Sequence, residues 1–180
     1  MSTGLTAKNP TLKSLFYTLF MSILMTACHT GDAPGSLQVI PLPTTDILYA
    51  LDVSPNYQVT LVGGYVWERG IAVYTDIYGH DAIVDTFSNK GQHDLLRDSK
   101  SQLITVGTDG YLFVNDDLSR SWQFKRLSNW DILHSIIEVD GGYVASGGKS
   151  YEQGYVYLIN DQFVIDTAMY TGYELSLIHI

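Results

Sequence analysis

Cysteine, positive charge and recognisable catalytic motifs are what this 180-residue sequence has least of. Its single cysteine excludes a disulfide-linked scaffold and a multi-cysteine zinc site. Ten Lys and Arg against nineteen Asp and Glu give a formal charge of −9, which argues against a nucleic-acid partner. The sequence has no phosphate-binding loop, dinucleotide fingerprint or nucleophile elbow, so we expect no cofactor. His80, His93 and His134 lack metal-ligand spacing, so we expect no metal and interpret them as polar groups of loops or sheet edges.

Apolar residues, by contrast, are plentiful. Hydrophobic residues make up 46% of the chain and charged residues 16%, a composition that excludes an intrinsically disordered protein. The length indicates a single domain. No segment after the N-terminal region keeps a 3.6-residue apolar period, so we expect almost no helix there.

The N-terminal region has the pattern of a signal peptide. Lys8 and Lys13 form a short basic stretch, and residues 15–27 (LFYTLFMSILMTA) carry no charge. This run is too short for a membrane-spanning helix, which needs about 20 apolar residues. Its length is typical of the apolar region of a signal peptide, so we expect residues 1–27 to be a helical signal peptide.

The end of this run resembles a bacterial lipobox. Small residues precede a cysteine in Met25-Thr26-Ala27-Cys28. The resemblance implies cleavage between Ala27 and Cys28, a lipid on the Cys28 sulfur, and anchoring by acyl chains in a bacterial cell envelope, facing the periplasm or the cell surface. The alternative is an ordinary secretory signal with a buried Cys28. Residues 28–45 are rich in Gly, Pro, Ser and Thr and are expected to be a tether, in which residues 37–42 have the composition of one strand.

A repeat begins at Asp46. Three segments open alike, at Asp46, Asp94 and Asp131, spaced 48 and 37 residues apart. An apolar strand ending in glycine follows each opening, at residues 59–63, 103–107 and 143–147. Two further strands complete each unit, at residues 71–75 and 82–87, 111–115 and 122–127, and 155–159 and 163–167.

Four short strands in about forty residues, repeated in the same order, are typical of β-propeller blades. We therefore predict an all-β fold with blades at about 46–91, 92–130 and 131–172. A β-sandwich is the alternative. Propellers have about 4–8 blades, so we expect residues 46–174 to be a partial propeller. Residues 175–180 (LSLIHI) resemble a translated transposase sequencing adapter, which favours an artefact there and a C-terminal truncation.

The middle unit carries the most specific motif. Residues 115–122 (NDDLSRSW) resemble the Asp-box, S-x-D-x-G-x-T-W, of sialidase-like BNR propellers. Asp117, Ser121 and Trp122 match, whereas Asn115 and Ser119 replace the serine and the glycine. The preceding V-G-x-x-G at residues 106–110 resembles that of photosystem-assembly-factor propellers. The box has a structural logic: its aspartate accepts backbone N–H bonds in a tight turn, and its tryptophan packs between neighbouring sheets.

The candidate binding residues are aromatic. Tyr and Trp are numerous, and several fall in predicted loops, where exposed rings suit a glycan or protein ligand. Packing between blades is the alternative. The residues are Tyr65, Trp67, Tyr78, Trp130 and Tyr151, with Tyr170 as a further loop tyrosine.

These features favour a lipid-anchored, non-catalytic binding or scaffold module for a protein or a glycan. A sialidase-like site would need an arginine cluster and a Tyr/Glu nucleophile pair. Neither Glu68 nor Glu138 is marked as the partner of a tyrosine, so we expect no catalytic residue here. A fragment of a carbohydrate-active hydrolase or lyase is the second possibility. An assembly factor for a membrane complex is the third.

Overall fold

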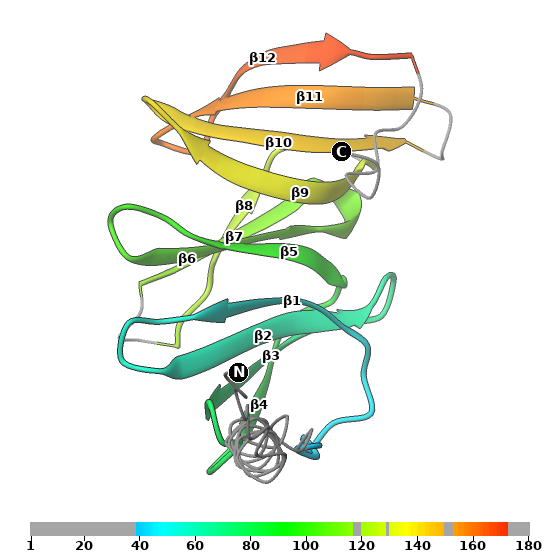
Figure 1. Cartoon of the computed structure of the whole chain (residues 1–180). Coiled ribbons are helices and arrows are strands. Elements are labelled where there is room, and N and C mark those ends of the chain that lie inside the picture. The colour runs from blue at the N-terminus through cyan, green and yellow to red at the C-terminus, as the bar shows by residue number, and fades with distance from the viewer. Residues whose placement is uncertain (1–38, 117–119, 129, 150–152, 173–180) are drawn as a thin grey trace, which may run out of the picture. The chain divides into compact units, whose positions relative to one another are not determined.

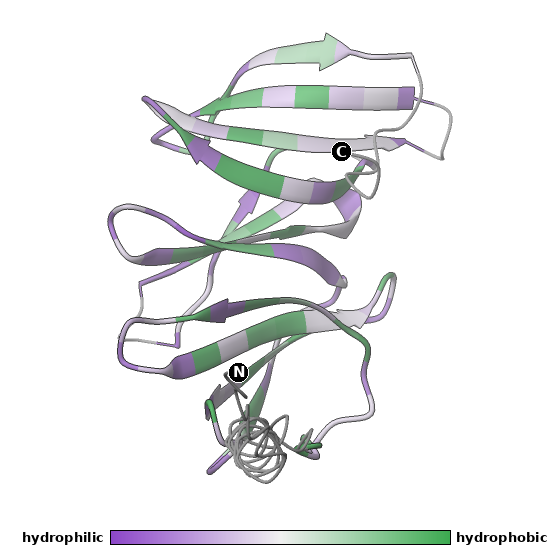
Figure 2. Ribbon diagram, viewed as in Figure 1, coloured by the Kyte–Doolittle hydropathy of each residue, from purple (hydrophilic) through white to green (hydrophobic). Residues whose placement is uncertain are grey.

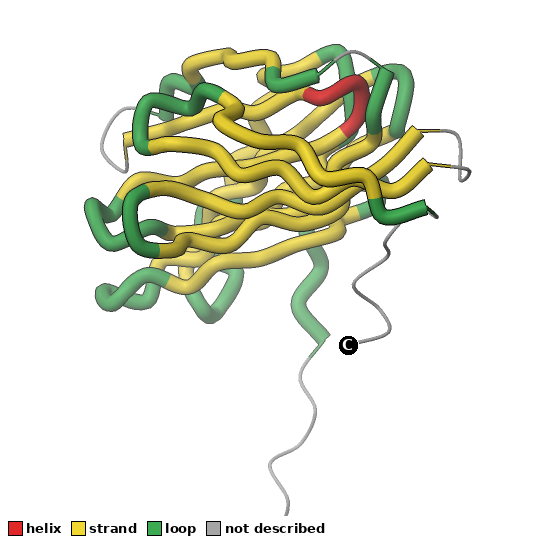
Figure 3. Tube along the Cα trace, turned by 90° about the horizontal axis from the view of Figure 1, so that it is seen from above, coloured by secondary structure: helices red, strands yellow, loops and turns green. Residues whose placement is uncertain are grey.

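The computed structural model describes residues 39–116, 120–128, 130–149 and 153–172. Within these ranges the chain forms twelve β-strands and one 3₁₀ turn, Thr108–Gly110, and contains no α-helix (Figure 3). The prediction of an all-β fold is therefore confirmed. No helix in this described part is long and apolar enough to cross a membrane. The signal peptide, Ala27, Cys28 and residues 175–180 lie outside the described residues.

The strands form three antiparallel sheets, each of four strands in chain order (Figure 1). The prediction of three four-stranded units is confirmed. Sheet 1 contains β1 (Leu48–Val53), β2 (Gln58–Tyr65), β3 (Arg69–Asp76) and β4 (Ile83–Ser88). Sheet 2 contains β5 (Gln92–Arg97), β6 (Gln102–Gly107), β7 (Tyr111–Asp116) and β8 (Gln123–Arg126). Sheet 3 contains β9 (Ile132–Val139), β10 (Gly142–Lys149), β11 (Gln153–Asn160) and β12 (Ile165–Tyr170).

Tight turns built on a side-chain oxygen connect several of these strands. Oδ1 of Asp98 accepts hydrogen bonds from the amides two and four residues later, at 3.0 and 2.7 Å. Asp76 and Asn160 make the same pair of bonds in the turns after β3 and β11. Asp and Asn favour such turns because their short side chains reach the backbone just ahead. Asp76 and Asn160 thus close the third-to-fourth-strand turn in sheets 1 and 3.

A glycine recurs at one position of all three sheets because two backbones meet there. Gly63, Gly107 and Gly147 lie on the second strand of each sheet, beside the first strand. A Cβ at any of them would overlap a backbone oxygen, that of Ile47, Gly91 and Ile132 respectively. Their position at the ends of the expected strands does not by itself explain why these residues are glycines. The close approach of two backbones explains it, because a side chain would not fit between them.

The apolar core lies between the sheets. Val62 and Ala72 of sheet 1 cluster with Leu95 and Leu103 of sheet 2. A larger cluster joins sheet 2 to sheet 3, so sheet 2 is covered on both faces. Apolar residues occur along the strands of all three sheets (Figure 2), and β6 and β7 have runs of consecutive buried residues, as a sheet covered on both faces requires. The second cluster consists of Ile104, Val106, Leu112, Val114, Leu133, Ile136, Tyr143, Ala145, Tyr157 and Ile159.

The segment that leads into β1 contains no strand. Residues 39–47 pair with no other strand, so the additional strand expected at residues 37–42 is wrong for its described part, residues 39–42. Pro41 is the physical reason, because it has no N–H to donate to a ladder, and Pro43 follows just beyond.

The close approach at Gly107 generates a prediction. Gly107→Ala should lower the free energy of unfolding by about 1–3 kcal/mol, because its Cβ would overlap the backbone oxygen of Gly91. Urea denaturation measures this. Lys100→Ala, at an exposed position of the turn between β5 and β6 where only the backbone amide makes a hydrogen bond, is the control and should change stability little. Equal stability of Gly107→Ala and wild type would contradict the role given to this contact.

Candidate functional site

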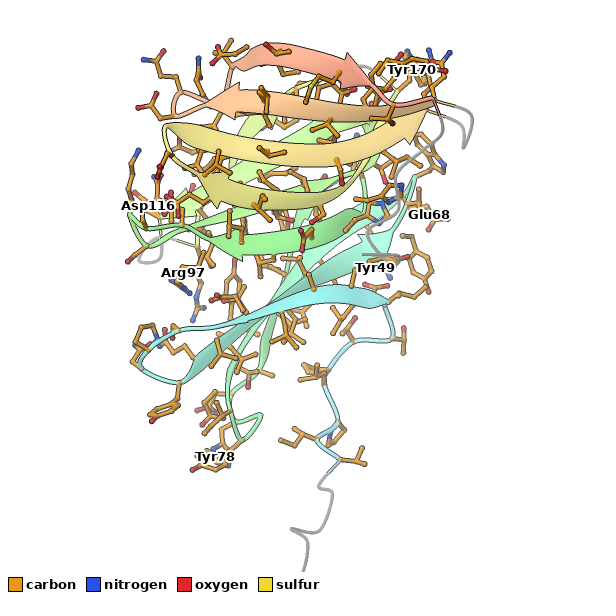
Figure 4. All side chains as sticks on the ribbon, turned by 45° about the horizontal axis from the view of Figure 1, so that its top comes forward. Tyr49, Glu68, Tyr78, Arg97, Asp116 and Tyr170 are labelled. Carbon is orange, nitrogen blue, oxygen red and sulfur yellow. The ribbon has the colours of Figure 1, made fainter. Side chains whose placement is uncertain are left out.

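Exposed aromatic residues gather at one end of the sheets. This end is where β2, β6 and β10 finish, and Figure 4 shows Tyr49, Glu68 and Tyr170 on this side, away from Arg97, Asp116 and Tyr78. We define the aromatic rim as Tyr65, Trp67, Trp130 and Tyr170. Trp67 is 52% exposed and Trp130 65%. The structure therefore brings four of the sequence candidates to a common end. The prediction of loop positions is wrong for Tyr65 and Tyr170, which are the last residues of β2 and β12.

One other candidate, Tyr78, does not join the rim. Tyr78 is exposed in the turn between β3 and β4, at the opposite end of sheet 1. Its amide donates to Oδ1 of Asp76, and its ring lies 5.7 Å from that of His80. Tyr151 lies outside the described residues.

Polar contacts hold Trp130 in an unusual backbone conformation. Its φ is 69°, in the left-handed region that costs free energy for a bulky residue. The Trp130 amide donates to Oδ1 of Asp109 at 3.0 Å, and the guanidinium of Arg126 binds the same oxygen at 2.8 Å. A backbone bond from the Gly110 amide to the Asp131 oxygen, 2.7 Å long, closes the loop. These contacts hold the backbone of Trp130, and its indole is exposed to solvent.

Cationic side chains border two of the other rim rings. Nζ of Lys90 lies 4.8 Å from the centre of the Trp67 ring. Arg69 lies over the Tyr65 ring at 5.5 Å and also forms an ion pair with Asp46. Such cation–π contacts orient a ring and place positive charge at its edge. The sequence analysis did not single out Lys90, Arg69 or Asp109. A signal was available for Arg69 alone, which lies two residues after Trp67 in the sequence.

Three further rings lie on the first strands of the three sheets, near the end that carries the aromatic rim. The rings of Tyr49 on β1 and His93 on β5 have centres 5.1 Å apart, and those of His93 and His134 on β9 are 5.8 Å apart. Nε2 of His93 also lies 3.1 Å from the Thr108 hydroxyl. Burial, together with the charge of His134, lowers the pKa of His93 to about 4. His93 is therefore neutral at neutral pH.

The described Asp-box residues lie at the other end, where sheets 1 and 2 meet. The Trp122 ring stacks on Phe87 with centres 4.6 Å apart, and its Nε1 donates to the Tyr74 hydroxyl at 2.8 Å. Asn115 is buried, and its Oδ1 has no hydrogen-bond partner in the described part. Ser121 is exposed. Asp117 and Ser119 lie outside the described residues.

A small pocket opens beside these residues. Tyr74, Asp76, His80, Asn115 and Arg120 contribute to its lining. Burial raises the pKa of Tyr74, and backbone N–H bonds from His80 and Tyr78 lower the pKa of Asp76. Arg120 lies over the Tyr74 ring at 5.3 Å. The pocket combines a carboxylate, a guanidinium and an unsatisfied amide oxygen, groups that suit a small polar molecule rather than a covalent mechanism.

The four arginines of the described residues occupy separate places. Arg69 and Arg126 pair with carboxylates at the rim, and Arg97 pairs with Asp52. Arg120 belongs to the pocket at the opposite end. They do not form the arginine cluster of a sialidase-like site. Within the described ranges there is also no group of three or more His, Cys, Asp or Glu that could hold a metal ion.

Comparison with known proteins identifies no family for this chain. No protein-family model matches the chain, and no curated protein matches it.

The lowered pKa of His93 predicts a pH-dependent stability. Unfolded histidine is protonated below about pH 6.5, whereas folded His93 stays neutral down to about pH 4. The unfolded state therefore binds more protons in this window, and His93 destabilises the fold increasingly as the pH falls through it. Thermal melts of wild type and His93→Gln between about pH 7.5 and 4 should show the variant gaining stability relative to wild type. A difference independent of pH would contradict this.

Proposed function

We propose that this chain is a lipid-anchored β-propeller of the bacterial cell envelope, whose aromatic rim binds a glycan without catalysis. Three consecutive four-stranded sheets, with sheet 2 covered on both faces, support the propeller. Their first strands β1, β5 and β9 are neighbours, linked by the Tyr49–His93–His134 contacts. Radial arrays of blades have this arrangement of first strands. The lipobox resemblance supports the anchor.

The presentation of Trp130 is the observation that carries the binding role. A large apolar ring on the surface costs free energy in water, and a left-handed backbone costs more. Here both occur together and are stabilised by Asp109 and Arg126. Strain of this kind is concentrated at ligand-binding and other functional sites. The Trp130 backbone is already held by its bond to Asp109, so a ligand that stacks on the ring loses little affinity to ordering of that backbone.

The spacing of the rim rings favours a glycan over a protein surface. Trp67 and Trp130 stand on separate loops of neighbouring sheets, each beside charged side chains. A sugar ring has an apolar C–H face that stacks on an indole and a polar edge that hydrogen-bonds to nearby cations. The core of a protein interface is instead one contiguous apolar patch depleted of charge.

No observation in the described residues favours either of the other two functions. A hydrolase or lyase of the sialidase type would use an arginine cluster, and the arginines described here are dispersed. The assembly-factor proposal rests on the V-G-x-x-G and Asp-box resemblance alone.

Trp130→Ala should weaken glycan binding at least tenfold, because the variant loses the stacking platform while retaining the sheets. The measurement is a carbohydrate array with the full chain, followed by titration against the oligosaccharides that bind. Tyr78→Ala is the matched control: it removes a ring that is 62% exposed but lies at the opposite end. If wild type binds no glycan on the array, or if both variants lose affinity equally, the rim is not the site.

The proposed anchor has its own test. Cys28→Ser should move the protein from the membrane fraction to the soluble extracytoplasmic fraction, because the sulfur that would carry the lipid is gone. Detergent-phase partitioning of wild type and variant measures the change. A wild-type protein that partitions into the aqueous phase would contradict lipidation and favour an ordinary secretory signal.

A further inference from the structure

The pocket beside the Asp-box residues lies between sheets 1 and 2, at the end opposite to the aromatic rim. Its volume is about 260 Å³. A single water needs only about 15 Å³, so the pocket has room for several waters or for one small molecule. We define its inner wall as Thr60 and Tyr74 of sheet 1 together with Leu103 and Asn115 of sheet 2. The rest of the lining consists of Gln58, Val59, Thr75, Asp76, His80, Asp81 and Arg120.

The same position between sheets 2 and 3 is filled by apolar packing. Each inner-wall residue has an equivalent there, which either stands at the same distance in sequence from the recurrent glycine of its sheet or pairs with the residue that does. The equivalents of Thr60, Tyr74, Leu103 and Asn115 are, in that order, Ile104, Val114, Tyr143 and Ile159. All four equivalents belong to the apolar cluster between sheets 2 and 3. The fold can therefore close this position, and the polar inner wall is a feature of the sequence at this one interface.

Asn115 supplies the observation that points to a ligand. The residue is only 2% exposed, and its Oδ1 has no hydrogen-bond partner among the described residues. A buried acceptor without a donor destabilises a fold, and native structures seldom leave one unless a water or a ligand supplies the donor. Because Asn115 lines the pocket, an N–H or O–H group of a molecule in the pocket can supply it.

Charged groups of both signs surround the inner wall. Asp76 and Asp81 contribute two carboxylates to the lining, and Arg120 contributes a guanidinium. The backbone hydrogen bond from His80 is the main cause that lowers the pKa of Asp76, so this carboxylate is ionised at neutral pH. A guanidinium over an aromatic ring, as Arg120 is over Tyr74, keeps the N–H groups in its plane available for a carboxylate. The pocket thus offers acceptors for an ammonium group and donors for a carboxylate.

We propose that this pocket binds a free α-amino acid, whose ammonium group donates to Oδ1 of Asn115 near the carboxylates of Asp76 and Asp81, and whose carboxylate binds Arg120. A zwitterion matches both kinds of group in one small space. An amine or a carboxylic acid alone matches one of them, and a neutral sugar places no charge against either. This inference does not rest on the proposed function, because the aromatic rim lies at the opposite end of the sheets.

Binding of free amino acids to the full chain tests the proposal. Thermal melts in mild detergent, with each of the common α-amino acids in turn at millimolar concentration, should show a raised Tm for at least one of them, and titration calorimetry then gives its Kd. The methyl ester, which lacks the carboxylate, and the N-acetyl derivative, which lacks the ammonium group, should each bind about tenfold more weakly or worse. If no amino acid binds, the pocket holds water only and the proposal is wrong. Equal binding of the ester or of the N-acetyl derivative would also overturn it.

Two variants test whether the binding occurs in this pocket. Asp76→Asn removes a charge and keeps the turn, because Asn160 makes the same pair of backbone bonds in sheet 3, and Arg120→Gln removes the guanidinium at an exposed position. Each should weaken binding about tenfold or more and leave the Tm without ligand nearly unchanged. Asp140→Asn and Lys125→Gln, which remove the same charges from exposed positions outside the pocket, are the matched controls and should bind as wild type does. Undiminished binding by both pocket variants would mean that the amino acid binds elsewhere and would overturn the proposal.

Discussion

Close contact between two backbones at one glycine position governs the construction of each sheet. The first strand passes so near the second at Gly63, Gly107 and Gly147 that no side chain fits between them. The ladder register shifts beside each of these glycines. A bulge re-aims the side chains of the first strand, which is the strand that meets the next sheet. The packing of the sheets on one another follows from this repeated local geometry.

Polar contacts between first strands then fix the sheets relative to one another. The guanidinium of Arg97 binds Asp52 through two nitrogens, at 2.7 and 2.9 Å, and so ties β5 to β1. Oδ2 of Asp94 accepts from the Ser135 hydroxyl and the Ile136 amide, at 2.7 and 2.8 Å, and ties β5 to β9. Both ties are charge-assisted, which makes them stronger and more directional than apolar contact. Because these contacts fix the sheets relative to one another, they also determine where the loops of the aromatic rim lie.

The sequence was sufficient for the strands but not for the site. The lack of a 3.6-residue apolar period, the short apolar segments and the repeated aspartate and glycine positions predicted three four-stranded units, because each signal is local. The roles of Asp109 and Arg126 were not predictable, since the bonds from the Trp130 amide and from Arg126 to Asp109 depend on how the turn before β7 packs against the end of β8 and the segment that follows it. The strand expected at residues 37–42 rested on apolar composition, but Pro41 lacks the N–H that a strand ladder needs, and residues 39–42 form no strand. Whether Trp67 and Trp130 could contact the same ligand likewise depends on how the sheets pack and cannot be read from their spacing in the sequence.

The turns built on Asp76, Asp98 and Asn160 have a consequence for how the chain reaches this fold. Every strand pairs only with strands next to it in sequence, so the loops that must close are short and their entropic cost is small. A turn that is stable by its own side-chain bonds provides a starting point for each hairpin. A sheet can therefore form as soon as its forty or so residues leave the machinery that synthesises or exports them. Folding then proceeds as a succession of small local events along the growing chain.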